Sequence, residues 1–223
     1  DMGYRLRHCV WEITLACCFS CKYCGSSADG KKRVNELSTA ECTDVAKQLA
    51  DIGCRRVSMI GGEVFMRDDW DLIISALTSR GVKTCIITNG FLFREEHIKR
   101  LKAVGIESVA VSLDGPKEVH DKYRQEGSYD RAVHAIRMLH SGGIPVSVIS
   151  TLNAENAPLL PELYEMLKNS RIFAWQLQAC SPMGNAAEGG VDYRFDPRQV
   201  IRFVEARLED APFTVGVADN IGY

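Results

Sequence analysis

The chain has 223 residues, of which 46% are hydrophobic and 25% are charged, a composition ordinary for a soluble globular protein with a sizeable core. Its formal net charge of −2 gives no basic field, which argues against nucleic acid as the main partner. No apolar run approaches the roughly 18 residues needed to cross a bilayer, and the first residues lack the charged and apolar regions of a secretory signal. We therefore predict a cytoplasmic protein with no membrane partner.

In chain order, short apolar or β-branched runs alternate with segments of helical spacing. Strands are predicted at residues 8–16, 55–63, 82–90, 106–115, 144–151 and 172–179. The helices that follow them are predicted at residues 38–53, 67–81, 94–105, 128–143, 156–170 and 196–210. Ser38 supplies a helix cap, Gly53 a helix end and Pro197 a helix start. Residues 213–217 have the composition of one more strand.

This alternation predicts an α/β fold with a parallel sheet. A strand followed by a helix and a short connection requires a right-handed crossover to the next strand. The strands are nearly all apolar, which indicates that both of their faces are covered. An open or closed β/α barrel and a doubly wound sheet both satisfy the pattern, and no linker divides the chain into two domains. In either fold the loops that leave the carboxyl ends of the strands carry the chemistry.

Four cysteines follow the first predicted strand, in the stretch "LACCFSCKYCG". The total of nine cysteines is odd, which argues against a disulfide framework in a reducing compartment and favours metal or redox chemistry. Cys17, Cys21 and Cys24 have the spacing C-x-x-x-C-x-x-C, and close cysteine runs of this kind hold iron-sulfur clusters. Three ligands would leave one iron of a cubane cluster open to another ligand. A structural zinc site is the alternative, although the adjacent Cys18 is an awkward fourth ligand.

Other distinctive residues also fall where strands end. "GGE" (residues 61–63) follows the second strand, "TNG" (residues 88–90) the third and "SLDG" (residues 112–115) the fourth. In a parallel sheet these loops meet at one edge, so they are expected to converge with the cysteine loop on one site.

The motif C-x-x-x-C-x-x-C has an aromatic residue, Tyr23, directly before its last cysteine, and "GGE" follows the second strand. In these two features the sequence resembles the radical S-adenosylmethionine (radical SAM) superfamily. The stretches "VSLDGPKEVHDKYR" and "GSYDRAVHAI" are more similar to the branch that modifies peptides and proteins or builds peptide-derived cofactors. The similarity runs from about His8 to the last residue. The fold it implies is a partial (β/α)6 barrel of parallel strands, like part of a TIM barrel, formed by residues 1–223 as one radical SAM core domain.

That branch commonly carries a cysteine-rich carboxyl-terminal extension, called SPASM or twitch, which holds auxiliary [4Fe-4S] clusters. The chain opens on Asp1 and stops at "VADNIGY" within what reads as a structured stretch. We therefore expect a longer parent protein with such a domain beyond this segment.

The resemblance also assigns roles to individual residues. The cluster ligands it implies are Cys17, Cys21 and Cys24, around a [4Fe-4S] cluster whose open iron chelates S-adenosylmethionine (SAM). The residues it implies for SAM binding are Tyr23, Gly61, Gly62, Glu63, Asn89, Ser112, Arg124 and Leu177.

Each of these side chains has a chemistry suited to its expected partner. Glu63 offers an anion to the SAM ammonium, and the Arg124 guanidinium matches the SAM carboxylate. Ser112 is expected near the ribose, with Tyr23 and Leu177 near the adenine. Glycines at 61 and 62 let the backbone approach the ligand where a Cβ would collide.

Several residues have a simpler structural interpretation. Asp114 is predicted to cap the turn before Pro116, and His120 to order a loop rather than to bind a ligand. The remaining cysteines are predicted to be small buried hydrophobes, namely Cys9, Cys42, Cys54, Cys85 and Cys180, with Cys18 beside the cluster. For Cys180, which lies just past the sixth strand, a place facing the active site or an auxiliary cluster is the alternative. No catalytic acid or base is assigned.

The function that the resemblance implies is reductive cleavage of SAM to a 5′-deoxyadenosyl radical, which takes hydrogen from a peptide or protein. A ribosomal peptide maturase that makes a crosslink, an epimer or an oxidised side chain is the leading hypothesis, with an electron donor of the flavodoxin or ferredoxin type. A radical SAM enzyme of cofactor or small-molecule biosynthesis is the alternative. The non-catalytic alternative is a structural zinc module.

Overall fold

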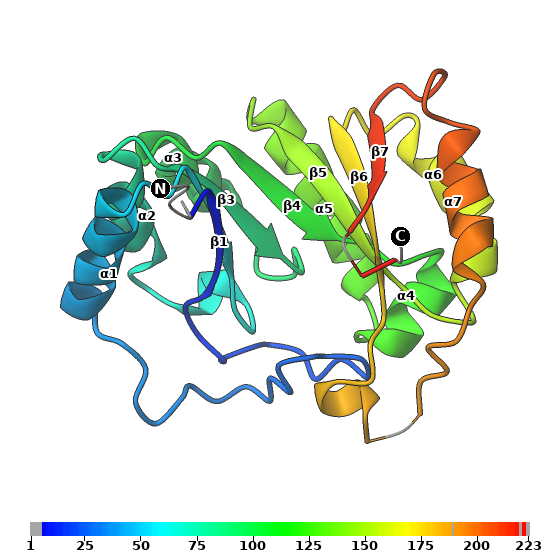
Figure 1. Cartoon of the computed structure of the whole chain (residues 1–223), viewed down its shortest axis with the longest axis horizontal. Helices are drawn as coiled ribbons and strands as arrows, with labels where there is room; N and C mark the ends of the chain where they lie inside the picture. The colour runs from blue at the N-terminus through cyan, green and yellow to red at the C-terminus, as the bar shows by residue number, and fades with distance from the viewer. Residues whose placement is uncertain (1–5, 189, 219, 222–223) are drawn as a thin grey trace, which may run out of the picture.

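The computed structural model describes residues 6–188, 190–218 and 220–221. Its centre is a sheet of seven parallel strands whose order in the sheet is their order in the chain (Figure 1). The strands are β1 (His8–Glu12), β2 (Arg56–Ile60), β3 (Lys83–Thr88), β4 (Ser108–Ser112), β5 (Val146–Leu152), β6 (Ala174–Ala179) and β7 (Thr214–Val217). The predicted parallel α/β fold is confirmed, and the suggested strand at residues 213–217 is present as β7.

Helices connect the strands. The α-helices are α1 (Thr39–Asp51), α2 (Trp70–Thr78), α3 (Glu95–Ala103), α4 (Lys117–Tyr123), α5 (Ser128–Ser141), α6 (Leu160–Leu167) and α7 (Pro197–Glu205). Three short 3-10 helices are η1 (Val64–Met66), η2 (Ala157–Leu159) and η3 (Gly184–Ala186). Each predicted helix is present, while α4, which follows β4 and the turn at Pro116, is an addition to the prediction.

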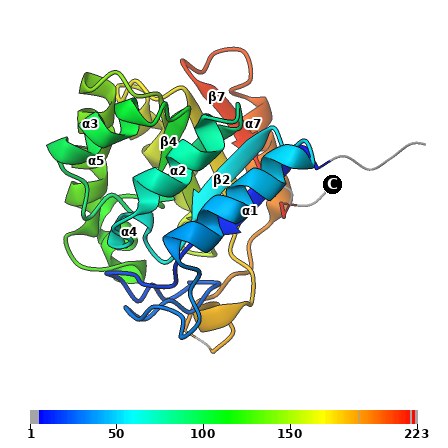
Figure 2. The same ribbon diagram turned by 90° about the vertical axis from the view of Figure 1, so that its left-hand side faces the viewer.

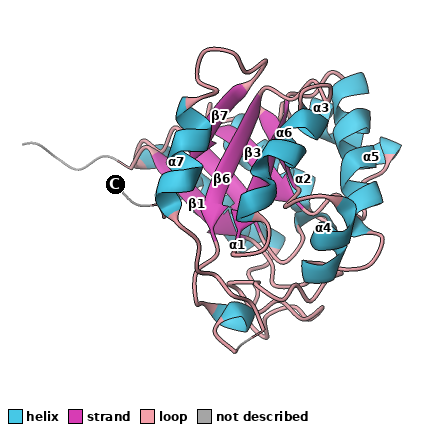
Figure 3. Ribbon diagram, turned by 90° about the vertical axis from the view of Figure 1, so that its right-hand side faces the viewer, coloured by secondary structure: helices cyan, strands magenta, loops and turns pink. Residues whose placement is uncertain are grey.

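The strand order decides between the two folds that the sequence left open. Because each strand pairs with the next one along the chain, every right-handed crossover places its helix on the same face of the sheet. The sheet twists and curls into a half-barrel with the helices outside (Figures 1, 2 and 3). A doubly wound sheet, which has helices on both faces, is thereby excluded.

The hydrophobic core lies between the convex face of the sheet and the helices. Residues that point outward from the strands, such as Val57, Ile86 and Trp175, are at most 1% exposed and pack in this core. The concave face mixes small and polar side chains, such as Ser58 and Ser147, with apolar ones, such as Ile87, and these line a cavity. The expectation that both faces of the strands are covered is therefore wrong for the concave face.

The helix ends follow the chemistry of the sequence. Ser38 and Glu41 form a reciprocal capping box at the start of α1, and Gly53, at a φ of 85°, closes the turn after this helix. At α7 the Asp196 side chain accepts from the Arg198 backbone N–H, next to Pro197 in the first turn. No helix in the described part of the chain is long and apolar enough to cross a membrane.

Candidate functional site

A cavity of about 860 Å³ occupies the concave side of the half-barrel. Strands β1 to β6 all contribute inward-facing side chains to its wall. The loops that leave the carboxyl ends of β1, β2 and β3 contribute as well, through residues such as Cys17, Gly62 and Asn89. Its volume lies toward the upper end of the roughly 300–1,000 Å³ that small-molecule sites span.

Three of the four clustered cysteines face this cavity. Cys17, Cys21 and Cys24 line it, whereas Cys18 is absent from its described lining. The Cys17 sulfur accepts from the Phe19 backbone N–H at 3.4 Å, and the Cys24 sulfur accepts from the Ala28 backbone N–H at 3.4 Å. The loop therefore presents three sulfurs to one space and supplies backbone donors that would stabilise negative charge on two of them.

Burial and mutual contact set the protonation of these thiols. A hydrogen bond with Cys18, together with burial, raises the pKa of Cys17, and the same hydrogen bond lowers the pKa of Cys18. Burial raises the pKa of Cys21 to about 11, against the opposing charge of Arg124. Cys17 and Cys21 are therefore protonated at neutral pH in the metal-free protein, so binding a metal through these two sulfurs releases protons.

The "GGE" loop is hydrogen-bonded to the chain that enters the cysteine loop. The Gly62 N–H donates to the Thr14 carbonyl at 2.8 Å, and the Glu63 N–H donates to the Ala16 carbonyl at 2.8 Å. A Cβ on Gly62 would lie 2.4 Å from the Ala16 carbonyl oxygen, closer than side-chain carbons approach backbone. Gly61 and Gly62 both line the cavity. Glycine is required at position 62 because the two loops approach each other too closely there for a side chain.

The Glu63 side chain is 1% exposed and is turned toward β3. Its carboxylate accepts from the Asn89 backbone N–H at 2.8 Å and from the Thr88 hydroxyl at 2.9 Å. It also accepts from the Phe65 backbone N–H at 3.2 Å. Burial raises the pKa of Glu63, although these hydrogen bonds oppose the shift. Its binding to an ammonium group stays a prediction.

Asn89 links β3 to the cysteine loop. It is 7% exposed and lines the cavity, and its side-chain amide lies 3.5 Å from the Cys18 sulfur and 3.9 Å from the Cys17 sulfur. Its side-chain oxygen accepts from the Phe91 backbone N–H at 2.9 Å. The structure therefore brings Asn89 to the site at which the sequence placed it.

A buried ionic network joins the fourth strand to the cysteine loop. Asp114 is 2% exposed and accepts from the Tyr23 hydroxyl, the Arg124 guanidinium and the Thr151 N–H, the last at 2.8 Å. Burial would raise the pKa of Asp114, but the charge of Arg124 outweighs it and holds the pKa below its ordinary value. Asp114 therefore ties together three segments rather than only capping a turn.

Other residues predicted to bind SAM or to order a loop lie in or beside this network. Arg124 lines the cavity, as do Tyr23 and Ser112, and its guanidinium lies 5.6 Å from the centre of the Tyr23 ring. His120 is fully buried, and its Nδ1 accepts from the Asp114 backbone N–H at 3.1 Å, in line with a loop-ordering role. Burial lowers the pKa of His120 to about 4, so the ring is neutral at neutral pH.

Leu177 does not belong to this site. It is fully buried in the core between the sheet and the helices and is absent from the cavity wall as described. Because side chains alternate along a strand, its neighbours Gln176 and Gln178 face the cavity instead. The expected contact of Leu177 with the adenine of SAM is therefore corrected.

The remaining cysteines are a mixed set. Cys42, Cys54 and Cys180 are buried, as predicted for small hydrophobes. Cys9 is only partly buried, and Cys85 lines the cavity with its sulfur 3.1 Å from the Ser58 hydroxyl. The prediction of a purely buried role is wrong for Cys85, because its strand position faces the concave side.

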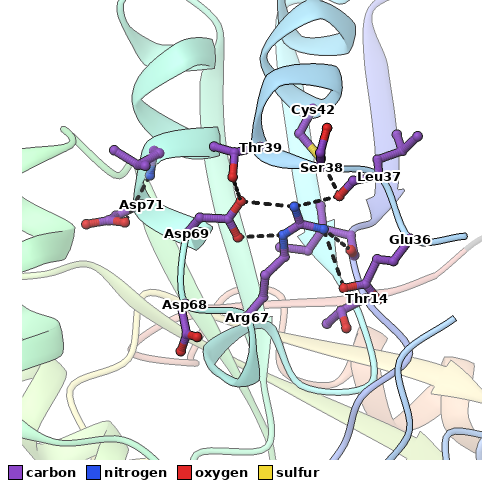
Figure 4. Close-up of polar contacts among 12 residues, drawn as sticks. Thr14, Glu36, Leu37, Ser38, Thr39, Cys42, Arg67, Asp68, Asp69 and Asp71 are labelled. Atoms are coloured by element: carbon purple, nitrogen blue, oxygen red, sulfur yellow. Dashed lines mark hydrogen bonds and ion pairs between the residues drawn. The ribbon is translucent and has the colours of Figure 1, made fainter. Parts of the chain in front are cut away.

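Sequence reasoning missed Arg67, which binds the chain on both sides of the cysteine loop (Figure 4). Its guanidinium pairs with Asp69 at 2.7 Å and donates to the Ile13 carbonyl at 3.0 Å and the Leu37 carbonyl at 2.8 Å. The side chain is 6% exposed and also lies 3.5 Å from the Glu36 carboxylate. One residue thus holds the chain before and after the cysteine loop, and only the dense "RDD" charge after the "GGE" loop hinted at it.

The donor set fits an iron-sulfur cluster. Within the described residues, no group of three or more His, Cys, Asp or Glu side chains is arranged to hold a single metal ion. In a cubane cluster each cysteine binds a different iron, which requires sulfurs spread around one space rather than packed on one point. Three cysteines that line one cavity, with backbone donors to two of the sulfurs, meet that requirement.

Comparison with known proteins identifies relatives. Residues 11–167 match the model of the family described as the radical SAM superfamily. The Fe-coproporphyrin III synthase of Methanosarcina barkeri is 34% identical over 164 residues, which are 73% of this chain and 41% of that protein. The mycofactocin maturase MftC of Mycobacterium tuberculosis is 37% identical over 146 residues, 64% of this chain and 37% of the maturase. The chain therefore spans less than half the length of these two relatives.

Among solved structures, the fold is similar to that of Streptococcus suis SuiB bound to S-adenosylmethionine. The TM-score is 0.84 at 17% sequence identity, over 96% of this chain and 51% of SuiB. Another structure of SuiB contains the precursor peptide SuiA and gives a TM-score of 0.83. At this identity the likeness establishes the fold alone.

Proposed function

Because the chain belongs to the radical SAM superfamily, we propose that it is the core of a radical SAM enzyme that modifies a peptide or protein. Cys17, Cys21 and Cys24 would hold the [4Fe-4S] cluster that the family implies. When bound, the cluster and SAM supply a 5′-deoxyadenosyl radical that takes a hydrogen atom from the substrate. The protein's own part is to place the two cofactors and the substrate in one cavity.

The SAM contacts would come from the rim loops that meet the cysteine loop. Asn89, Ser112 and Arg124 line the cavity next to it: Asn89 directly follows β3, Ser112 ends β4, and Arg124 directly follows α4. The Arg124 charge is offset by Asp114, so the guanidinium is held in place by one carboxylate and is able to meet a second. Glu63, behind the rim, would receive the SAM ammonium.

The charge of the cavity wall is the observation that favours a peptide as substrate. Among the described residues that line it, the only Lys or Arg side chains are Arg56 and Arg124, and no Asp or Glu is present. Both arginines are in ion pairs, Arg56 with Glu107 at 2.9 Å and Arg124 with Asp114. The wall is otherwise made of apolar, small and uncharged polar side chains, which suit the amides of a peptide.

The tetrapyrrole alternative has sequence similarity in its favour, since one relative is a synthase of Fe-coproporphyrin III. A tetrapyrrole with several carboxylates needs several unpaired cations, because a carboxylate taken out of water must be compensated. In the described wall Arg124 is assigned to the SAM carboxylate, which leaves only Arg56, and Arg56 already pairs with Glu107 at 2.9 Å. We therefore rank the peptide above the tetrapyrrole.

The test is direct. Anaerobically reconstituted protein is expected to be brown and, with dithionite and SAM, to release 5′-deoxyadenosine. Addition of the peptide encoded by a short reading frame beside the gene should give a product of altered mass, whereas iron-coproporphyrin should be returned unchanged. Colourless protein that contains zinc and no iron would refute the enzyme proposal, and conversion of iron-coproporphyrin alone would establish the alternative.

The proposal also includes an electron donor and a further domain of the parent protein. We propose a one-electron donor of the flavodoxin or ferredoxin type for the cluster, and a cysteine-rich carboxyl-terminal domain with auxiliary clusters in the longer parent protein. The second rests on the short span of this chain within its relatives. Iron analysis of the parent protein tests it, because auxiliary clusters would raise the iron content above the roughly four atoms of one cubane.

A further inference from the structure

The turn after β6 contacts the cysteine loop through the backbone of two predicted cluster ligands. The Asn185 side-chain amide donates to the Cys21 carbonyl at 2.9 Å, and the Asn185 backbone N–H donates to the Cys24 carbonyl at 2.9 Å. The short helix η3, which contains Asn185, lies beside the cysteine loop at the rim of the half-barrel (Figures 1 and 3). One residue from the other end of the sequence thus holds the carbonyl groups of two cysteines.

Gly184 makes this approach possible. Its φ of 54° is in the left-handed region, and a Cβ at this position would lie 2.2 Å from the Cys24 carbonyl oxygen and 2.6 Å from the Gly25 carbonyl oxygen. No side chain fits between the two loops. Ala186, two residues after Gly184, is 3% exposed and packs with Tyr23, so the turn is anchored by apolar contact as well as by hydrogen bonds.

The contact joins two parts of the half-barrel that the sheet does not join. The cysteine loop follows β1, and the Gly184–Asn185 turn follows β6, with four strands between them in the sheet. Residues 13–38 contain no helix or strand, so few hydrogen bonds of regular structure restrain the cysteines. A loop of this length loses much conformational entropy when it is ordered, and external contacts must offset that loss.

We propose that Gly184 and Asn185 are positioning residues for the cluster ligands Cys21 and Cys24. They act through the carbonyl groups: holding a carbonyl fixes its peptide plane, and the peptide plane fixes the direction of the Cα–Cβ bond that carries the sulfur. Ligands must be held to within about 0.5 Å and 10–20° for a metal site to form readily. This inference rests on the proposed function for the identity of the group that is bound.

A matched pair of variants tests the inference. Asn185→Ala removes the hydrogen bond to the Cys21 carbonyl. Asn220→Ala is the control, since Asn220 makes two hydrogen bonds to the Ala179 backbone, at 2.8 and 3.0 Å, away from the cysteine loop. Both variants replace an asparagine whose side chain hydrogen-bonds to backbone groups, so a general loss of stability would affect them alike.

The first measurement uses the metal-free protein. Alkylation of Cys21 and Cys24 by iodoacetamide, followed by peptide mass spectrometry, should be faster in Asn185→Ala than in the wild type and unchanged in Asn220→Ala. The second follows the visible absorption of the reconstituted cluster in air. We expect its lifetime to fall about 10-fold or more in Asn185→Ala, the usual effect of losing a group that supports a metal ligand, and to stay at the wild-type value in Asn220→Ala.

Asn185→Asp gives an independent check. It keeps the shape of the side chain but replaces the donor with an oxygen that repels the Cys21 carbonyl, so it should behave like Asn185→Ala. Equal alkylation rates and equal cluster lifetimes in the wild type and both Asn185 variants would overturn the inference. If the wild type binds no cluster at all, the proposed function fails, while the alkylation rates still decide whether the turn positions the cysteines.

Discussion

The buried ion pair between Asp114 and Arg124 gives a stability prediction that the structure makes quantitative. The Asp114 side chain is 1% exposed and the Arg124 side chain 11%, so Asp114→Asn leaves a largely buried guanidinium without its carboxylate. Removing one member of a buried pair costs about 3–5 kcal/mol of unfolding free energy. Because Arg124 is partly exposed, we expect Asp114→Asn to cost about 3 kcal/mol, the lower end of this range. For a domain of this size that loss lowers the melting temperature by about 6–12 °C.

Urea unfolding of the metal-free protein at pH 7, followed by circular dichroism, measures this cost. Glu107→Gln is the control, because Glu107 pairs with Arg56 and Lys83 while remaining 25% exposed, and exposed pairs contribute less than about 1 kcal/mol. The double variant Asp114→Asn with Arg124→Met removes both charges and should recover part of the loss. A cost for Asp114→Asn no larger than that of Glu107→Gln would refute the reasoning.

The same pair predicts a dependence on pH. Arg124 holds the folded pKa of Asp114 below its unfolded value of about 3.9, so the carboxylate stabilises the fold above that pH. The stabilisation is lost as the pH falls below about 4 and the carboxylate is protonated in the folded state. The difference in stability between wild type and Asp114→Asn should therefore be constant from pH 7 to about 5 and shrink on further acidification. A difference that grows in acid would contradict this sign.

Three further predictions concern the cofactor site. Cys21→Ala should abolish both the brown colour and the release of 5′-deoxyadenosine, and a variant that kept a full complement of iron would show that Cys21 is not a ligand. Glu63→Gln should keep the cluster but weaken SAM binding in isothermal titration calorimetry. It should also lower stability by about 1–3 kcal/mol, because each carboxylate oxygen of Glu63 accepts from one backbone N–H, so the new amide N–H₂ must face the buried donor of either Phe65 or Asn89. Unchanged SAM affinity would exclude the predicted ammonium contact. Gly62→Ala forces a Cβ to within 2.4 Å of the Ala16 carbonyl oxygen. It should reduce iron incorporation during reconstitution, and incorporation at the wild-type level would show that the two loops separate at little cost.

The strand positions were predictable because each strand has a distinctive composition and ends in glycine or polar residues. Which side of a strand a residue faces was harder, since nearly continuous apolar runs hide the alternation of side chains. Leu177 was placed in the cavity on the family resemblance alone, whereas Gln176 and Gln178, polar residues on either side of it, are the ones that face inward. Alternation of polar and apolar residues within β6 would have given the correct side.

The polar contacts show a different limit. The sequence marked Glu63 and Asn89 by their position after strands, and the structure does bring them to the cysteine loop. The sequence did not indicate that the Glu63 carboxylate accepts hydrogen bonds from the backbone N–H groups of Phe65 and Asn89, because backbone donors carry no signal in the sequence. The role of Arg67 was hidden for the same reason, since its carbonyl partners at Ile13 and Leu37 carry no signal in their side chains.

Contacts from the ends of several strands hold the long irregular cysteine loop in place, so that three of its cysteines line one cavity. Gly62 reaches the loop from β2, Asn89 from β3, Asp114 from β4 and Asn185 from β6, and each of them contacts a different part of the cysteine segment. Consecutive strand order makes this possible, because it leaves the concave face free of helices and turns every strand end toward the same rim.

A perturbation at any one of these strand ends acts on the cysteines locally, while the other contacts hold the rest of the loop. The Asn185 and Gly62 variants should therefore weaken the site separately, with effects on cluster lifetime that add when the two are combined. A combined effect much smaller than that sum would mean that the loop moves as one unit.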